Sequence, residues 1–118
     1  MTDPKLSITV REVPEIVNAS RGRHFLSELE SGMASDHPFI VLDCSKVRQM
    51  DRPTVQLILS CLEEVMKRNG DVKLAGVPAR AMARLETTGV SRLFESFETN
   101  AGAVNSFRRA KVDAASLG

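Results

Sequence analysis

The clearest pattern of apolar and polar positions lies between residues 38 and 70. Four apolar residues at 39–42 follow Pro38, and a run of this length favours a strand covered on both faces. Asp51 and Pro53 mark the start of the helix predicted next, and Asn69-Gly70 marks its end. Its apolar residues recur at helical spacing and form one stripe: Val55, Ile58, Leu59, Leu62, Val65 and Met66.

The rest of the chain continues this alternation of strand and helix. Residues 6–10 alternate between apolar and polar, which predicts a half-exposed strand at a sheet edge. Four alternations with short connections are typical of a largely parallel sheet covered by crossover helices, so we expect an α/β protein. The remaining elements are predicted as helices at 20–33, 79–86 and around 103–107, and strands at 72–75 and 93–97.

Length and composition indicate a single domain. The chain has 118 residues and a formal net charge of +1, which gives no reason to expect a nucleic acid or an anionic membrane as partner. No apolar signal region or run of about 18 apolar residues is present, so we expect a cytoplasmic protein without membrane insertion. Cys44 and Cys61 are expected to be reduced thiols in or near the core.

The sequence contains little that points to catalysis. His24 and His37 have no partners at a motif spacing, and no nucleophile elbow, dinucleotide fingerprint or phosphate loop is present. Asp43 and Asp51 follow a predicted strand, where α/β proteins often place sites, but a strand end and a helix cap are the favoured roles. We therefore expect no enzyme, metal or cofactor, with a small enzyme using Asp43 or Asp51 as a minor alternative.

The turn before the long helix is more informative. Asp51 can accept the backbone N–H of Thr54 while Pro53 occupies an early helical position, an arrangement worth roughly 1 kcal/mol. A phosphate can be accommodated at a helix N-terminus, and its added charge would alter a docking surface. Thr54 and Ser45 are the candidate hydroxyls for such a modification.

Three blocks of the sequence stand out: FIVLDCSKVRQMD (39–51), NGDVKLAGV (69–77) and LETTGVSRLF (85–94). Together they resemble the STAS domain of bacterial anti-sigma factor antagonists. The match spans roughly residues 6–107, and the blocks keep the family's order and spacing. The resemblance implies a four- or five-stranded mixed, largely parallel sheet with helices packed around it, in a single domain. We accordingly expect a disordered N-terminus at 1–5, a STAS-like domain at 6–110 and a flexible tail at 111–118.

The resemblance also implies a partner-switching role. Such a domain binds a serine kinase that is also an anti-sigma factor, displaces the sigma factor, and is turned off when a serine at the helix start is phosphorylated. The family's motif there is typically Asp-Ser-Ser-Gly, whereas this chain has Asp51-Arg52-Pro53-Thr54. Asp51 matches the motif, but Arg52 stands at the phosphoacceptor position, which excludes phosphorylation there.

We therefore predict an anti-sigma factor antagonist-like protein that regulates transcription by binding an anti-sigma factor/serine kinase. Asp51, Arg52, Pro53 and Thr54 would contact the partner, with Arg52 reaching a carboxylate or a phosphate. Any phosphorylation would fall on Thr54 or Ser45. The alternative is a STAS-like subunit or scaffold of another assembly, such as a lipid ABC transporter partner or a stressosome-like complex. The sequence leaves open whether the chain also forms a homodimer.

Overall fold

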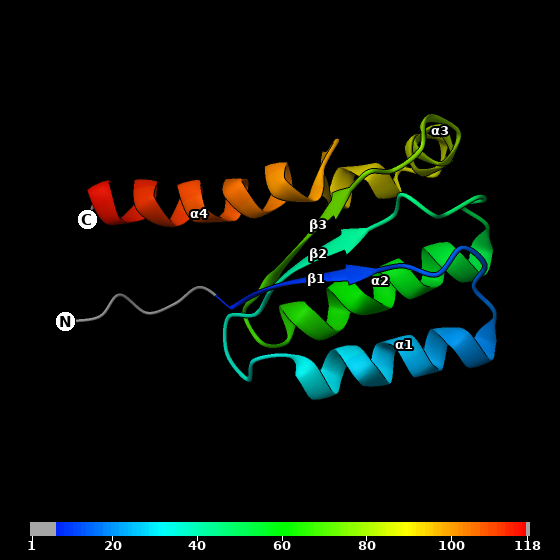
Figure 1. Ribbon diagram of the computed structural model, residues 1–118, viewed down its shortest axis with the longest axis horizontal. Helices are drawn as coiled ribbons and strands as arrows, with labels where there is room; N and C mark the ends of the chain where they lie inside the picture. Colours follow the sequence, from blue (N-terminus) through cyan, green and yellow to red (C-terminus); the bar gives the residue numbers. More distant parts are fainter. Residues whose placement is uncertain (1–6, 118) are drawn as a thin grey trace.

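The computed structural model describes residues 7–117, with side chains up to residue 110. Strands and helices alternate along the chain, which confirms the predicted α/β fold (Figure 1). The predicted disorder of residues 1–5 lies outside the described part. The elements are β1 (Ile8–Glu12), α1 (Ala19–Gly32), β2 (Phe39–Asp43), α2 (Arg52–Met66), β3 (Asp71–Ala75), α3 (Ala79–Thr87), the 3-10 helix η1 (Val90–Leu93), β4 (Glu95–Phe97) and α4 (Asn100–Leu117).

The four described strands form one parallel sheet in the order β1-β2-β3-β4. Ile8 is paired with Phe39, and Phe39 with Asp71, so β1, β2 and β3 start at the same level, while the shorter β4 starts opposite Lys73. β1 lies at one edge, as the alternating pattern predicts. Because all the strands are parallel, their carboxyl ends lie at the same end of the sheet, and the connections to the helices start there.

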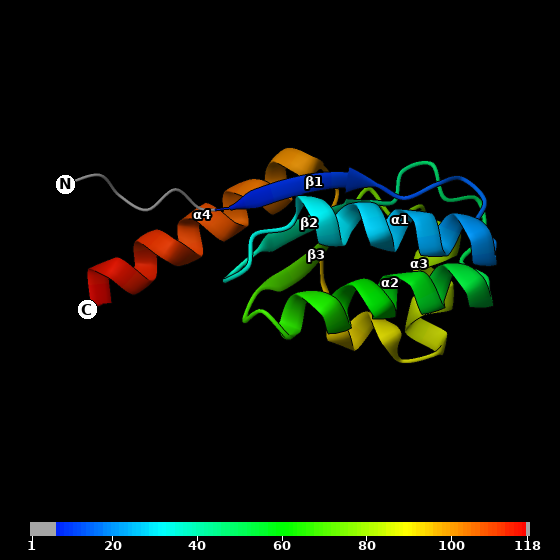
Figure 2. The ribbon, with the colours of Figure 1, turned by 90° about the horizontal axis from the view of Figure 1, so that it is seen from below.

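Helices cover the two faces of the sheet unequally. Helices α1, α2 and α3 lie on one face, and α4 alone lies on the other (Figures 1 and 2). Ile40 and Leu42 point into the larger apolar cluster beneath the three helices, while Val41 points into the smaller cluster beneath α4. The uninterrupted apolar run of β2 therefore reflects burial on both faces, as expected.

The buried stripe of α2 differs from the predicted one. Met66 is 55% exposed, and Leu59 and Leu62 are only partly buried. Ile58 and Val65 of the predicted stripe are fully buried, so the prediction is partly confirmed. Because α2 packs against both β3 and α1, Leu57 and Cys61, which the prediction left out, are buried as well. The buried residues of α2 are Thr54, Leu57, Ile58, Cys61 and Val65.

The end of the domain also departs from the prediction. Residues 90–93 form a short 3-10 helix after Gly89, whose φ of +80° gives the left-handed turn, so the last strand is only Glu95–Phe97. Phe94 follows the 3-10 helix directly, and its side chain is 8% exposed and belongs to the larger apolar cluster. The backbone of α4 is helical to Leu117, and the flexibility expected of residues 111–118 stays a prediction.

Candidate functional site

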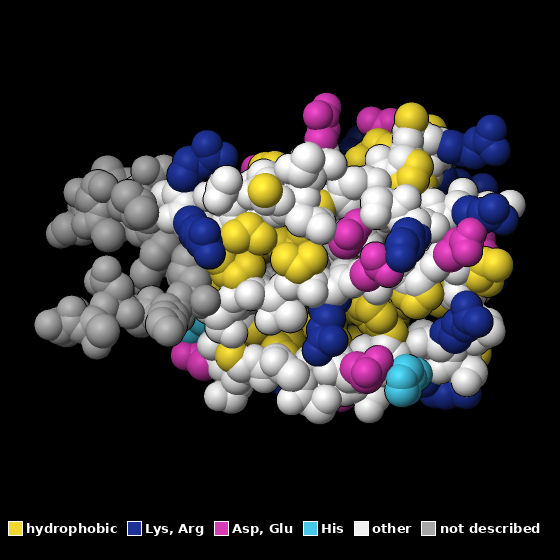
Figure 3. Space-filling view, viewed as in Figure 1, with side chains coloured by type: hydrophobic (Ala, Val, Ile, Leu, Met, Phe, Trp, Pro, Cys, Tyr) yellow, Lys and Arg dark blue, Asp and Glu magenta, His cyan; other side chains and the backbone are white. Residues whose placement is uncertain are grey.

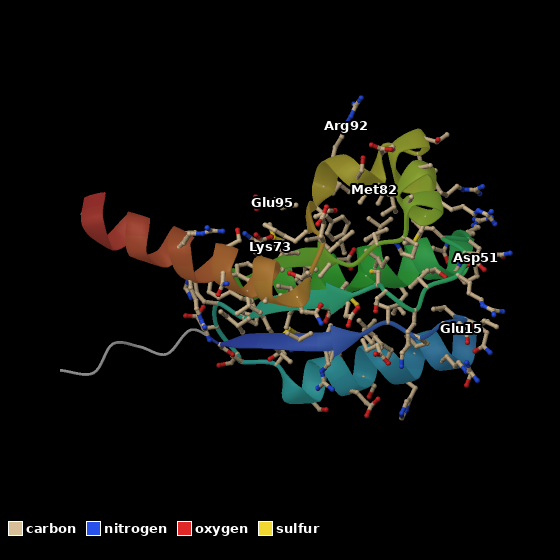
Figure 4. The ribbon with its side chains drawn as sticks, turned by 45° about the horizontal axis from the view of Figure 1, so that its top comes forward. Glu15, Asp51, Lys73, Met82, Arg92 and Glu95 are labelled. Atoms are coloured by element: carbon tan, nitrogen blue, oxygen red, sulfur yellow. The ribbon has the colours of Figure 1, made fainter. Side chains whose placement is uncertain are left out.

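The segment between β2 and α2 is anchored to the core by two buried side chains. Val47 and Met50 are buried at 2% and 4% exposure, and both belong to the larger apolar cluster. The segment ends at Asp51, directly before α2, and Figure 4 shows Asp51 at one end of the molecule with Glu15 nearby. The start of α2 is therefore a fixed surface feature.

The predicted helix cap is confirmed. One carboxylate oxygen of Asp51 accepts a hydrogen bond from the backbone N–H of Thr54 at 3.2 Å and another from its hydroxyl at 2.6 Å. Pro53 lies within the first two helical positions, where no N–H is needed. Arg52 and Pro53 are exposed, whereas Thr54 is only 2% exposed. Of the four predicted contact residues, Arg52 and Pro53 thus project most fully from the surface.

The two candidate hydroxyls have different environments. The hydroxyl of Thr54 is buried and donates to Asp51, so a modifying enzyme would reach it only after the first turn of α2 opens. Ser45 is exposed, and its backbone N–H donates to Asp43 at 2.9 Å. Ser45 is therefore the more accessible of the two.

Asp43 has a structural role at the carboxyl end of β2. One of its oxygens accepts from Ser45, and the other accepts from the side-chain amide of Asn100, at the start of α4, at 3.0 Å. Burial alone would raise the pKa of Asp43, but hydrogen bonds from Asn100 and Ser45, together with the charge of Lys46, outweigh it and hold that pKa below its ordinary value. Both Asp43 and Asp51 are thus engaged in holding helix starts.

Two hollows flank Asp51. Arg48 contributes to both, and its Nε lies 2.7 Å from a carboxylate oxygen of Glu15. The smaller hollow, about 210 Å³, is lined by Glu15, Ile16, Arg48, Gln49, Asp51 and Thr54. The larger, about 450 Å³, lies toward α3 and is lined by Arg48, Gln49, Met50, Asp51, Arg80, Ala83, Arg84 and Thr87.

Sequence reasoning singled out Asp51 and its neighbours but missed Arg80 and Arg84. Both follow the carboxyl end of β3, four residues apart on one helix, and that spacing places them on the same face. Because the strands are parallel, the start of α3 and the start of α2 both lie at the carboxyl-terminal end of the sheet. The spacing was therefore the available signal.

Other candidate groups do not add a chemical centre. Within the described residues, no group of three or more His, Cys, Asp and Glu side chains could hold a metal ion. His24 is exposed on α1 and lies 3.3 Å from Glu28. Cys44 and Cys61 are free and buried, as predicted, and burial raises the pKa of each thiol to about 12. In the part of the chain described here, no helix has the length and apolarity needed to cross a membrane.

Comparisons with known proteins agree with this architecture. A crystal structure of a candidate anti-sigma factor antagonist from Thermotoga maritima is 17% identical, with a TM-score of 0.72, over 88% of this chain and 92% of that one. A sulfate transporter family protein from Wolinella succinogenes is 17% identical, with a TM-score of 0.73, over 95% of this chain and 93% of that one.

The STAS domain of a SulP transporter from Vibrio cholerae is 20% identical, with a TM-score of 0.74, over 96% of this chain and 88% of that one. At these identities the similarity establishes the fold alone. A comparison with curated protein sequences finds no significant match. The family model of the STAS domain matches residues 7–103, which is most of the chain. The chain therefore belongs to the STAS domain family.

Proposed function

We propose that this chain is a protein-binding module of the anti-sigma factor antagonist type, which regulates transcription in the cytoplasm by binding an anti-sigma factor/serine kinase. It acts by association and not by catalysis. The observation that carries the proposal is the start of α2, where Arg52 and Pro53 are exposed on a turn that the Asp51 cap and the buried Val47 and Met50 hold fixed. A preformed surface of this kind loses little conformational entropy on binding.

Binding of the partner would not depend on phosphorylation at the usual family position, because Arg52 occupies it. Among the described residues, no carboxylate oxygen lies within 4.0 Å of the Arg52 guanidinium. The guanidinium is therefore available to a carboxylate or a phosphate on a partner. Regulation by phosphorylation, if it is retained, would use the accessible Ser45 in preference to the buried Thr54.

A second candidate function is a subunit of another assembly, such as a transporter or a stressosome-like complex. The observation that favours it is the set of similar structures, because two of them are of sulfate transporter proteins and their TM-scores of 0.73 and 0.74 match that of the antagonist. Because an antagonist and transporter proteins share this fold, the identity of the bound partner would distinguish the two candidate functions.

Affinity capture tests the proposal. The tagged chain is used as bait in its native host after cross-linking, and captured proteins are identified by mass spectrometry. We expect an anti-sigma factor with a kinase-type ATPase domain to be recovered with the wild type and lost with Arg52→Glu, while the melting temperature changes little because Arg52 is exposed.

The matched control is Arg92→Glu. Arg92 is also exposed and points away from the molecule at a distance from Asp51 (Figure 4), so the same charge reversal there should leave capture intact. Specific recovery of a membrane transporter would favour the second candidate function. Equal capture of the kinase by the Arg52 variant would remove the start of α2 from the interface.

A further inference from the structure

Three arginine side chains line the hollow between the start of α2 and helix α3. They are Arg48, Arg80 and Arg84. Dark-blue Lys and Arg side chains gather over this end of the molecule, at the right of Figure 3, where Figure 1 places α3 and the start of α2. Because the net charge of the whole chain is only +1, this end concentrates positive charge that the composition does not reveal.

Little within the chain compensates this charge. Arg48 is paired with Glu15, but within residues 7–110 no carboxylate lies within 4.0 Å of Arg80 or Arg84. Arg80 and Arg84 are four residues apart on α3, a spacing at which like charges repel. Arg80 also lies in the first turn of α3, where a cation is unfavourable next to the positive end of the helix dipole. Arg84, by contrast, lies in the last turn of α3, where a cation is favourable. The fold therefore gives no reason for the position of Arg80 beside Arg84.

The geometry points to a carboxylate-rich segment of a protein partner as the occupant of this arginine-lined hollow, a proposal that rests on the proposed function and specifies the chemistry of the partner. The guanidinium groups of Arg80 and Arg84 can each hold a carboxylate through two parallel hydrogen bonds, whereas Arg48 is already paired with Glu15 and adds only its positive charge. The small side chain of Ala83 and the largely buried Met50 also line the hollow, so acidic residues separated by small apolar ones would fit it.

A nucleic acid fits this hollow less well. Asp51 lines the same hollow and Glu15 is held beside it by Arg48, so a continuous phosphate backbone would meet two carboxylates. The lining contains no aromatic side chain on which a base could stack. A side chain that carries a single carboxylate can approach an arginine without approaching either acid.

The test is an NMR titration of the ¹⁵N-labelled chain, including the arginine side-chain Nε–H signals. The probe is a blocked peptide of alternating Glu and Ala. We expect saturable shifts at Arg48, Arg80 and Arg84 that weaken as salt is added, because these contacts are electrostatic. The double variant Arg80→Glu/Arg84→Glu should weaken binding by at least about tenfold, the factor that corresponds to about 1.4 kcal/mol.

The matched control is Arg108→Glu/Arg109→Glu, which reverses two exposed arginines on α4, on the opposite face of the sheet. This control should bind the peptide within about twofold of the wild type, since only long-range charge is altered. Equal weakening by both double variants, or shifts spread over other surfaces, would overturn the proposal. So would tighter binding at these arginines of an oligothymidylate of similar length or of phosphatidylserine vesicles.

The capture experiment separates this inference from the proposed function. If the kinase is recovered equally by the wild type and by Arg80→Glu/Arg84→Glu, the proposed function stands and the acidic-partner inference fails. If the wild type recovers no anti-sigma factor but the peptide still binds at the hollow, the proposed function fails while the chemistry of the hollow stands.

Discussion

At the scale of single residues, Asp43 is the acidic group with the most defined role. It joins the end of β2 to the following turn through Ser45 and to α4 through Asn100. Asp43→Asn replaces one acceptor oxygen with an amide that faces one of these two donors. We expect this variant to lose roughly 1–2 kcal/mol of unfolding free energy at pH 7, measured by urea denaturation.

The pH dependence of that loss follows from the direction of the pKa shift. The pKa of Asp43 in the folded protein lies below its ordinary value of 3.8, so its contribution is present above that value and is lost as the pH falls through the folded pKa. The stability difference between wild type and Asp43→Asn should therefore shrink as the pH is lowered below 3.8. A difference that stays constant down to acid would show that the carboxylate charge is not its source.

The residues at the turn show what a sequence can and cannot reveal at this scale. The Asp51 cap was predictable because it depends only on neighbours in the chain, and it is present. The burial of Thr54 was not predictable from its position, because it depends on how the helix packs on the sheet. For Arg80 and Arg84, the sequence spacing places both on one helix face, but their closeness to the turn depends on the order of the strands.

At the scale of elements, Lys73 attaches α4 to the sheet. Its side chain is 6% exposed, and its ammonium lies 2.9 Å from Glu95 and 2.6 Å from the hydroxyl of Ser106. Figure 4 shows Lys73 and Glu95 close together. The ammonium also lies 4.5 Å from the centre of the Phe107 ring, within the range of a cation–π interaction. One side chain thus connects β3, β4 and α4.

Two substitutions separate the packing of Lys73 from its charge. Lys73→Ala should cost about 2–4 kcal/mol of unfolding free energy, since it leaves a space beneath α4. Lys73→Met keeps most of the volume and should cost about 1 kcal/mol or less, because the loss of polar contacts is offset by no longer burying a charge. Thermal or urea unfolding measures both. Equal losses would mean that the polar contacts, and not the packing, hold α4.

Elements were predicted best where their pattern is local. The alternating residues of β1 and the continuous apolar run of β2 indicate an edge strand and a central strand, and both lie where expected. The stripe of α2 was predicted only in part: Ile58 and Val65 are buried, but Leu57 and Cys61 were left out. Because α2 contacts both the sheet and α1, periodicity alone could not separate sheet-facing positions from flanking ones. The buried Lys73 gave no signal, because its partners come from β4 and α4.

At the scale of the whole molecule, the two apolar clusters are coupled through the sheet. Val41 and Ala75 belong to the cluster beneath α4, while the adjacent Leu42 and Leu74 belong to the cluster beneath the other helices. Loss of either cluster would uncover the same two strands. We therefore infer that the domain unfolds as one cooperative unit, as small single domains usually do.

The two cysteines allow that cooperativity to be measured. Cys44 follows β2 and Cys61 lies in α2, both have no exposed surface, and burial raises the pKa of each to about 12. At pH 8 a thiol with that pKa is ionised on the order of once in ten thousand molecules. Both thiols should therefore react with a thiol reagent only when the domain opens. The labelling rate under native conditions should give the same free energy as urea unfolding.

Mass spectrometry of the labelled peptides distinguishes the two sites. Equal rates at Cys44 and Cys61 are expected if α2 leaves the sheet only in global unfolding. Faster labelling of Cys61 would instead show that α2 opens on its own. Because Arg52 lies in the first turn of that helix, such opening would move the proposed partner-binding surface, and the fixed start of α2 on which the proposed function depends would be contradicted.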